Sequence, residues 1–449
     1  MPQIQIPKIV GPAGQLYADP QPSPDETTFR VDNNSAEYYQ SAYYLAHKTQ
    51  VQKIPPRHAT TALQLNNFLP ANVVAAIQKA KEIQFHAAGD TGAAKVSRSQ
   101  TALTAIQHEA HVADSMAQEV QQAGDTGPAF LFLLGDVIYN FGEAQYYYDQ
   151  FYEPYRAYDR PIFAIPGNHD AMVFGPTSTA PKNVSLAAFQ ANFCAQSVAR
   201  SADALGMMRS VMTQPGVYFT LDAPFVSIIG LYSNALEGPG VISSQGGHYP
   251  ITDEQIAFLQ SELTRLKPDR EAGKRAVVIA VHHPPLSVDA VHGGSTGVQA
   301  DLDTCCSAAN LWPDLVLSGH AHLYQRFTHR TATGKEIPYI VAGNGGYAVT
   351  APVTKSPPAG TTVGSDTLAV APILEFGFLT ITASATQLSV QFKVSVGEGA
   401  QVRDSVVVDL KENRIATQGG KSSKATAQKA GPKPKSKPVH KAKNKRHRS

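Results

Sequence analysis

Apolar runs that end in a glycine and a polar side chain recur along this sequence, and they constrain the fold more than any other feature. Residues 129–134 are apolar at every position, and they are followed by Gly135, Asp136 and Tyr139. A run without polar alternation is typical of a strand that is covered on both faces. In sheets built from such strands, ligands bind beyond the carboxyl ends. The pattern therefore predicts a site that contains Asp136 and Tyr139.

Other segments show the same order of apolar run, turn and polar side chain. A strand is predicted before each of the blocks Gly89-Asp90-Thr91-Gly92, Gly167-Asn168-His169-Asp170, His282-His283-Pro284 and Gly319-His320-Ala321-His322. Because the carboxyl ends of parallel strands meet at one edge of a sheet, we expect these side chains to gather there. The blocks offer carboxylate, phenol, amide and imidazole groups and no thiolate, a set that suits hard or borderline metal ions.

The order of strands and helices predicts an α/β fold. Strands that lead to Asp90, Asp136 and Asn168 alternate with helices expected over 70–81, 99–122 and 144–155. Such alternation implies right-handed crossovers and a parallel sheet. The later part of the chain adds a capped helix over 252–266. It also adds strand signals typical of the second half of a two-sheet core, at 217–221, 226–231, 276–281, 315–317, 337–342, 378–383, 388–394 and 402–410.

Composition divides the chain into three regions. Residues 1–59 are expected to form an N-terminal extension, an irregular arm with one short helix over 37–47, and residues 60–410 to form the folded body. Residues 411–449 form a Lys-rich tail with too few apolar side chains to fold, so we expect disorder. The Pro, Gly, Ser and Thr-rich stretch over 350–367 is expected to be a mobile surface loop, with a lid over the polar blocks as the alternative.

Charge is distributed unevenly between these regions. The tail holds 13 Lys and Arg and one acidic residue, so residues 1–410 carry a net charge of −10 although the whole chain carries +2. The simplest interpretation of the tail is a solvated, solubilising segment. The alternative is weak binding to a polyanion, such as nucleic acid, polyphosphate or a membrane surface, with a steep dependence on salt.

The compartment is inferred from apolar segments and from cysteines. No apolar run approaches the roughly 18 to 20 residues of a membrane-spanning helix. The first residues lack the cationic and apolar regions of a secretory signal. We therefore expect a cytoplasmic protein, with a periplasmic or secreted one as the alternative if a signal has been removed. Cys194, Cys305 and Cys306 are too few for a disulfide framework, and we expect buried or loop thiols rather than metal ligands.

The polar blocks contain more ligands than one metal ion can use. Asp136 is central among them, and its two carboxylate oxygens allow it to bridge two ions roughly 3.5 to 4 Å apart. His320 and His322 are two positions apart in a turn, so each can reach a different ion. The residues therefore predict a centre of two metals.

Two choices between neighbouring candidates remain at this level. Alternation along a strand turns either His282 or His283 toward the site, but not both. Asp125 repeats the Gly-Asp-Thr-Gly pattern of Asp90, but it precedes its strand. We therefore expect Asp125 at the wrong edge of the sheet for a ligand.

In order and approximate spacing, the blocks resemble the five signature blocks of the purple acid phosphatases, which belong to the calcineurin-like metallophosphoesterases. The resemblance covers residues 83–346 and depends on the matches Gly89-Asp90-x-Gly92, Gly135-Asp136-x-x-Tyr139, Gly167-Asn168-His169-Asp170, Val281-His282-x-Pro284 and Gly319-His320-x-His322. It implies a four-layer α/β/β/α sandwich, with residues 60–410 as the catalytic domain. Tyr139 is the discriminating residue, because most members of the wider superfamily have another residue there.

The same resemblance implies the ligands of each metal, and it favours His282 over His283. Fe(III) would be held by Asp90, Tyr139 and His322, and a divalent Fe, Zn or Mn ion by Asn168, His282 and His320, with Asp136 as the bridge.

The implied activity is the hydrolysis of phosphate monoesters by a metal-bound hydroxide, on a small-molecule substrate. His169 would act as the general acid that protonates the leaving group. His292 stands in a His-Gly block after the His-x-Pro motif, and it would contact the substrate phosphate or the leaving group. Two alternatives are a phosphodiesterase or nucleotide hydrolase on the same site, and a polyanion-binding protein whose metal site is structural.

Overall fold

Two β-sheets face each other in the part of the chain that the structure describes. The computed structural model describes residues 53–92, 102–139, 141–173, 184–234, 240–247, 249, 251–349, 357–397 and 399–416. The helix predicted over 37–47 and the chain beyond Ala416 lie outside these ranges. Within them, none of the helices has the length and apolar character of a membrane span.

The first sheet contains nine strands among the described residues. In spatial order they are β1 (Leu63–Gln64), β5 (Phe219–Ala223), β6 (Val226–Leu231), β7 (Ala276–Val281), β8 (Leu315–Ser318), β10 (Glu336–Ala342), β9 (Tyr324–Arg330), β12 (Asp366–Leu368) and β11 (Thr362–Val363). Strands β6, β7, β8 and β10 run parallel, and β9, β12 and β11 extend this group with antiparallel pairs.

The second sheet contains seven described strands. In spatial order they are β16 (Arg414–Ile415), β15 (Gly399–Asp409), β14 (Gln387–Val396), β13 (Gly377–Ser384), β2 (Glu82–Ala88), β3 (Leu131–Leu133) and β4 (Ile162–Ala164). Strands β2, β3 and β4 are parallel, whereas β13 pairs with β2 in the antiparallel sense. The predicted parallel strands therefore form one group within each sheet. Antiparallel strands extend both groups, so both sheets are mixed.

The unalternated apolar runs are explained by burial on both faces of each sheet. Along β7, Val278 and Ala280 face a core that contains residues of both sheets, such as Phe132 of β3. Val277 and Ile279 face the opposite way, into a core shared with the helices. Because neither face meets water, no polar residue interrupts the strand.

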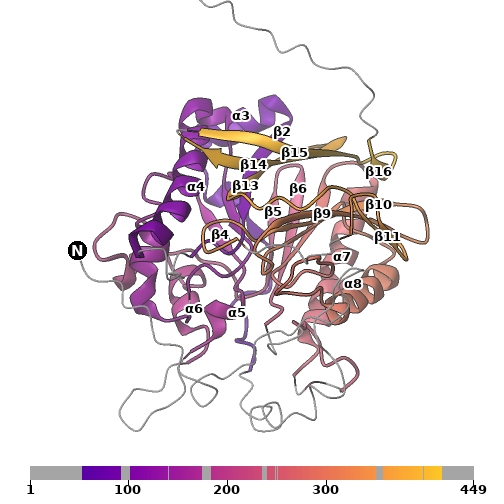
Figure 1. The fold of residues 1–449 in the computed structure, drawn as a ribbon, viewed down its shortest axis with the longest axis horizontal. Coiled ribbons are helices and arrows are strands. Elements are labelled where there is room, and N and C mark those ends of the chain that lie inside the picture. The colour runs from indigo at the N-terminus through magenta and orange to yellow at the C-terminus, as the bar shows by residue number, and fades with distance from the viewer. Residues whose placement is uncertain are drawn as a thin grey trace, which may run out of the picture. The chain divides into compact units, whose positions relative to one another are not determined.

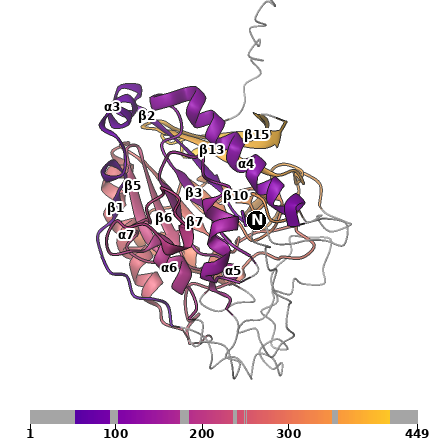
Figure 2. The same cartoon turned by 90° about the vertical axis from the view of Figure 1, so that its left-hand side faces the viewer.

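Helices cover the outer faces of the two sheets (Figures 1 and 2). Helix α4 (Ala102–Ala123) packs on β13, β14 and β15 through an apolar stripe that includes Val112, Met116 and Val120. Helix α7 (Glu254–Glu271) packs on β6 and β7, and α8 (Thr296–Ala309) packs on α7. The shorter α3 (Ala71–Ala80) precedes β2. The α/β fold and its four layers, α/β/β/α, are confirmed.

The prediction of an α-helix over 144–155 is wrong. This segment forms a 3-10 turn at Ala144–Tyr146 and a π-helical turn at Tyr148–Tyr152. The Gln150 side chain turns inward, where its Oε1 accepts the Tyr139 amide at 2.7 Å. The aromatic side chains around it are buried rather than arranged on one helix face. Tertiary packing therefore overrides the helical spacing.

Two other boundaries differ from expectation. The stretch over 350–367, for which the composition predicts a loop, contributes β11 and most of β12 to the edge of the first sheet, although residues 350–356 lie outside the described ranges. The segment predicted as tail begins with ordered chain, because Arg414–Ile415 forms β16 beside β15. Asp125 lies in the exposed turn Gly124–Thr126 before β3, at the edge expected for a residue that is not a ligand.

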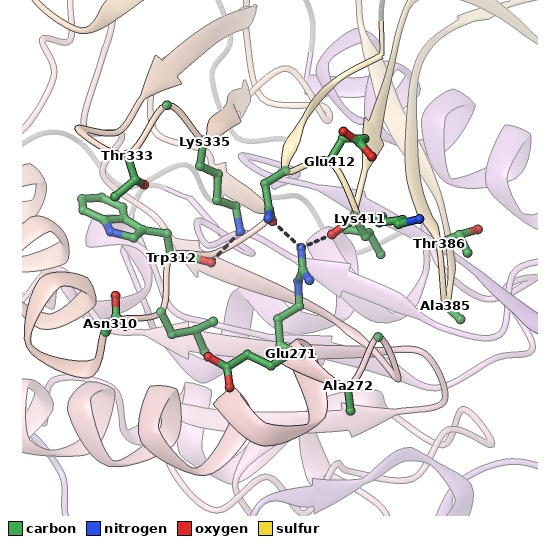
Figure 3. Close-up of a pocket in the computed structure, with 16 residues that line it drawn as sticks. Glu271, Ala272, Asn310, Trp312, Thr333, Lys335, Ala385, Thr386, Lys411 and Glu412 are labelled. Carbon is green, nitrogen blue, oxygen red and sulfur yellow. Dashed lines mark hydrogen bonds between the residues drawn. The ribbon is translucent and has the colours of Figure 1, made fainter.

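A buried charge network joins α7 to the amino ends of β7 and β8. The Asp314 carboxylate, which is 0% exposed, accepts hydrogen bonds from Arg270 Nε and Lys335 Nζ, both at 2.8 Å, and from the Val277 amide at 2.9 Å. Figure 3 shows Lys335 also donating to the Trp312 carbonyl, beside a pocket of about 810 Å³. This pocket lies at the end of the strands opposite the polar blocks.

Replacing Asp314 by asparagine is expected to lower the free energy of unfolding at neutral pH by about 3 to 5 kcal/mol, because two buried cations lose their counter-charge. Burial would raise the pKa of Asp314, but Lys335 and Arg270 hold it below its usual value. The stabilisation is therefore complete above the ordinary carboxyl pKa and disappears as pH falls through the lowered one. Urea denaturation at several pH values would measure both effects.

Lys274→Ala is the matched control for this prediction. It removes an exposed ion pair, Lys274 to Asp269 at 3.0 Å, and should cost at most about 1 kcal/mol. Equal effects of the two substitutions would contradict the assignment of the Asp314 network.

Candidate metal centre

The polar blocks leave their strands through turns of unusual backbone geometry. Asp90, Asp136 and His320 have φ angles of 55°, 52° and 68°, in the left-handed region that non-glycine residues rarely adopt. Each follows a glycine at a strand end. Such conformations cost about 1 to 3 kcal/mol each and persist where the surrounding contacts enforce them. Their concentration here marks a functional site.

The glycines of the blocks are required by close approach. A Cβ at Gly167 would overlap Asp136 Oδ1, and a Cβ at Gly319 would lie 2.6 Å from Asp90 Oδ2. The backbone of each glycine therefore lies directly against an aspartate carboxylate of another loop. Any side chain at the glycine position would occupy the same space.

Asp170 ties two of these loops together. Its carboxylate accepts the amides of Gly167 at 2.9 Å and of Val137 at 3.1 Å. Burial and the neighbouring Asp136 raise the pKa of Asp170 to about 7, while the donated amides oppose the shift. Sequence reasoning assigned no role to this residue, although it closes the block that contains Asn168.

One half of the candidate centre surrounds the Tyr139 hydroxyl. Tyr139 Oη lies 2.9 Å from Asp90 Oδ1, 2.8 Å from Asp136 Oδ2 and 3.4 Å from His322 Nε2. These side chains come from the ends of β2, β3 and β8 and are buried. The structure thus brings together the three residues predicted for Fe(III), beside the predicted bridge.

The other half surrounds Asn168, the first residue of α5 (Asn168–Ala171). Asn168 Oδ1 lies 3.0 Å from His282 Nε2 and 3.1 Å from His320 Nδ1. These are the three residues predicted for the divalent ion, and all are buried.

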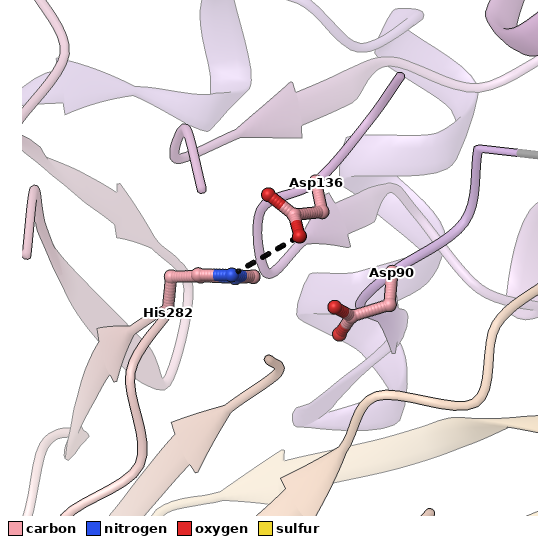
Figure 4. Close-up of side chains that lie close together, drawn as sticks. All are labelled: Asp90, Asp136 and His282. Atoms are coloured by element: carbon pink, nitrogen blue, oxygen red, sulfur yellow. Dashed lines mark ion pairs between the residues drawn. The ribbon is translucent and has the colours of Figure 1, made fainter. Parts of the chain in front are cut away.

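Asp136 connects the two halves through a single oxygen. Its Oδ2, which faces Tyr139 Oη, also lies 3.4 Å from His282 Nε2. Figure 4 shows Asp90, Asp136 and His282 pointing toward one another, and their ligand atoms lie within 4.8 Å of each other. This is the position that a bridging carboxylate requires.

The chemistry of the donor atoms fits a metal ion. His282 Nδ1 lies 2.8 Å from the Leu134 carbonyl oxygen, which only accepts, so Nδ1 carries a proton and, in the neutral ring, Nε2 presents a lone pair. That lone pair faces oxygens of Asn168 and Asp136 in a buried space. Lone pairs that converge in this way repel one another unless a proton or a metal ion lies between them.

The electrostatics show the same demand for positive charge. Burial would lower the pKa of His282, but the facing carboxylates of Asp136 and Asp90 raise it to about 9. Burial and the proximity of Asp136 raise the pKa of Asp90 to about 7. A cation between these groups would relieve the repulsion between the two carboxylates.

The structure turns His282 and His283 in different directions. His282 Nε2 faces Asn168, whereas His283 Nδ1 lies 2.8 Å from Ser233 Oγ. The His283 ring instead packs against His320, with the ring centroids 4.2 Å apart. His283 is therefore a buried support of a candidate ligand, a role that the sequence did not indicate.

His169 and His292 lie at the mouth of the candidate centre, and both are partly exposed. The His169 amide donates to Asp136 Oδ1 at 2.9 Å, and its ring lies 4.4 Å from the Tyr139 ring. The His292 ring lies 4.5 Å from His320 and 5.0 Å from His322. The structure thus brings both histidines against the candidate ligands, and their roles stay predictions.

Tyr347 is a further residue of the site that sequence reasoning missed. Its ring stacks on Tyr139 with the centroids 3.6 Å apart and an interplanar angle of 4°, and its amide donates to the Asp90 carbonyl at 3.0 Å. The signal was present, because the apolar strand β10 ends at Ala342 and is followed by Gly343-Asn344-Gly345-Gly346-Tyr347.

Comparisons with known proteins show the family and the fold of the chain. The profile of the calcineurin-like phosphoesterase family matches residues 84–324. The fold is similar to the purple acid phosphatase PPD1 from yellow lupin (Lupinus luteus) seeds, with a TM-score of 0.50 and 15% identity, over 74% of this chain and 54% of that one. The chain therefore spans about half the length of the lupin protein. At this identity, the likeness shows the fold.

A second solved structure to which the chain is similar is GAP50, described as the anchor in the inner membrane complex of Plasmodium. It matches with a TM-score of 0.49 and 13% identity, over 74% of this chain and 91% of that one. No curated protein matches the sequence.

Proposed function

We infer the function from one premise: this chain belongs to the calcineurin-like phosphoesterase family. Membership implies a metal-dependent phosphoesterase that works through a centre of two metals. We propose more narrowly that it hydrolyses phosphate monoesters in the manner of purple acid phosphatases. The observation that carries this proposal is the Tyr139 hydroxyl, 2.9 Å from Asp90, 2.8 Å from Asp136 and 3.4 Å from His322.

The proposed metal ligands are the residues of the two halves of the centre. Tyr139, Asp90 and His322 would hold Fe(III), because a phenolate and a carboxylate suit a hard, highly charged ion. The softer set of Asn168, His282 and His320 would hold a divalent Fe, Zn or Mn ion, with Asp136 shared. When bound, the two ions supply an activated water and shield the negative charge of the phosphate group.

His169 would supply the proton that the leaving alkoxide needs. Its backbone N–H donates a hydrogen bond to Asp136 Oδ1 at 2.9 Å, which fixes its backbone beside the proposed bridging residue. Its ring is partly exposed and can exchange protons with water. A general acid must lie close enough to the leaving group to protonate it, and it must regain its proton from water. The position of His169 supports both requirements.

His169→Ala should therefore lower kcat on an aryl phosphate by on the order of a hundredfold, the usual contribution of a general acid. Both metals should stay bound, because the candidate ligands are untouched. Metal analysis and steady-state kinetics check the two parts, with His111→Ala, at an exposed histidine of α4, as the matched control. A variant that also lost its metals would assign His169 to structural support.

The proposed function is tested by phosphate release from an aryl phosphate monoester and from the corresponding diester. The wild type loaded with Fe and Zn, or Fe and Mn, should prefer the monoester. Preference for the diester would favour a phosphodiesterase on the same site. A folded protein that held two metals and hydrolysed neither compound would contradict an enzymatic role and leave the structural metal site of a polyanion-binding protein.

A further inference from the structure

His292 is held over the candidate centre by a buried carboxylate. It belongs to the loop between β7 and α8, and its Nδ1 lies 2.9 Å from Asp289 Oδ2. The same oxygen also accepts the His292 amide at 3.1 Å. Asp289 is 0% exposed, whereas the His292 side chain is 13% exposed. The pair therefore extends from the protein interior to the mouth of the site.

The Asp289 carboxylate determines which ring nitrogen carries the proton. An ionised carboxylate only accepts hydrogen bonds, so His292 Nδ1 must donate. The other nitrogen, Nε2, then lies on the ring edge turned away from Asp289. The ring itself lies 4.5 Å from His320 and 5.0 Å from His322, between the two halves of the centre. A partner of this kind fixes both the tautomer and the orientation of an imidazole.

The loop that carries this pair is anchored to the sheet. Ser287 Oγ donates to the His292 carbonyl at 2.9 Å and accepts the Asp289 amide at 3.1 Å. Gln325 of β9 donates to the same hydroxyl at 3.2 Å and accepts the Val288 amide at 2.7 Å. These groups hold the loop from both sides, in addition to the hydrogen bond from the His292 amide to Asp289.

We propose that Asp289 is a positioning residue of the hydrolytic site, which acts through His292 on the phosphate group bound at the metal centre. The proposal rests on the proposed function for the identity of the ligand. The role of Asp289 is to hold His292 Nδ1 protonated and to aim Nε2 at the phosphate oxygens or at the leaving group. Asp289 itself touches neither the substrate nor a metal.

Asp289→Asn is the direct test. The neutral amide that replaces the carboxylate can turn either its oxygen or its NH2 group toward Nδ1, so the charge that fixes the tautomer is lost while the shape is kept. Affinity of the metal-loaded protein for inorganic phosphate, measured by calorimetry, and kcat/KM on an aryl phosphate should each fall by on the order of 10- to 100-fold. The metal content and the visible spectrum should be unchanged.

A double-mutant cycle separates positioning from general structural support. If Asp289 acts through His292, Asp289→Asn should have no further effect in the His292→Ala background. Equal losses in both backgrounds would overturn the proposal, and so would wild-type phosphate affinity in Asp289→Asn. Asp301→Asn is the matched control, because it alters a buried carboxylate of α8 that accepts from Ser243 Oγ, and it should leave phosphate affinity unchanged.

A second variant keeps the test decisive if Asp289→Asn does not fold. Ser287→Ala loosens the same loop and leaves the carboxylate in place, so it should cause a smaller loss that also vanishes in the His292→Ala background. Phosphate binding does not depend on turnover. A protein that follows this cycle but hydrolyses no ester would therefore refute the proposed function alone, whereas a metal-loaded wild type that binds no phosphate would refute both.

Discussion

Asp136→Ala is expected to release both metal ions and to abolish hydrolysis. Asp136 Oδ2 lies 2.8 Å from Tyr139 Oη and 3.4 Å from His282 Nε2, so one oxygen serves both halves of the centre. Loss of a residue that merely orients a metal ligand reduces metal affinity about 10- to 100-fold. Loss of a shared ligand should exceed this range for each ion. Metal analysis after loading, together with turnover of an aryl phosphate, measures the effect.

The backbone at Asp136 requires a second variant and a control. Its φ of 52° strains an alanine more than an asparagine, which visits this region more readily. Asp136→Asn removes the charge without that strain and should lose both ions as well. Asp125→Ala alters another aspartate that follows a glycine, in an exposed turn, and should keep both ions and full activity. Two ions retained in both Asp136 variants would rule out the bridge.

Tyr139→Phe should bleach the iron-loaded, oxidised protein without unfolding it. Burial, together with the facing Asp136 and Asp90, raises the pKa of Tyr139 well above its usual value, so without a metal the hydroxyl stays protonated. A phenolate bound to Fe(III) absorbs visible light by charge transfer, and the wild type should be violet to pink. The phenylalanine ring can still stack on Tyr347, 3.6 Å away, so the fold should persist. Visible and circular dichroism spectra report the two results.

Tyr347→Phe is the matched control for the colour. It removes the same hydroxyl from the stacked ring, which is not a predicted ligand, and the visible band should remain. A colourless wild type with stoichiometric Fe(III) would exclude Tyr139 as a ligand. The more general metallophosphoesterase centre, with Mn or Zn in both positions, would then be the better description.

The sequence was sufficient for the features that are written in short segments. Apolar runs such as 129–134, each followed by a glycine and a ligand, predicted the α/β fold, and both fold and family are confirmed. These signals are strong because strand burial and turn chemistry depend on neighbouring residues. The side chains named as ligands from those segments do converge in the structure, from Asp90 through His322, and their metal roles remain to be tested.

The sequence was insufficient where the conformation depends on distant contacts. The spacing over 144–155 favoured a helix, but the bond from the Tyr139 amide to Gln150 Oε1 and the surrounding aromatic packing select a π-helical turn. Periodicity reports which face of a regular element is apolar, and it carries no information about a side chain that must turn inward.

Residue types, strand ends and turn glycines were thus determined by the sequence alone, because each follows from the physical chemistry of a few adjacent residues. The tertiary structure decided that one oxygen of Asp136 faces both halves of the centre, that Tyr347 stacks on Tyr139, and that the Asp289 carboxylate lies 2.9 Å from His292 Nδ1. These relations join loops whose positions are set by the packing of two sheets. Irregular loops have no period, so the distances between their side chains exist only once the whole core has formed.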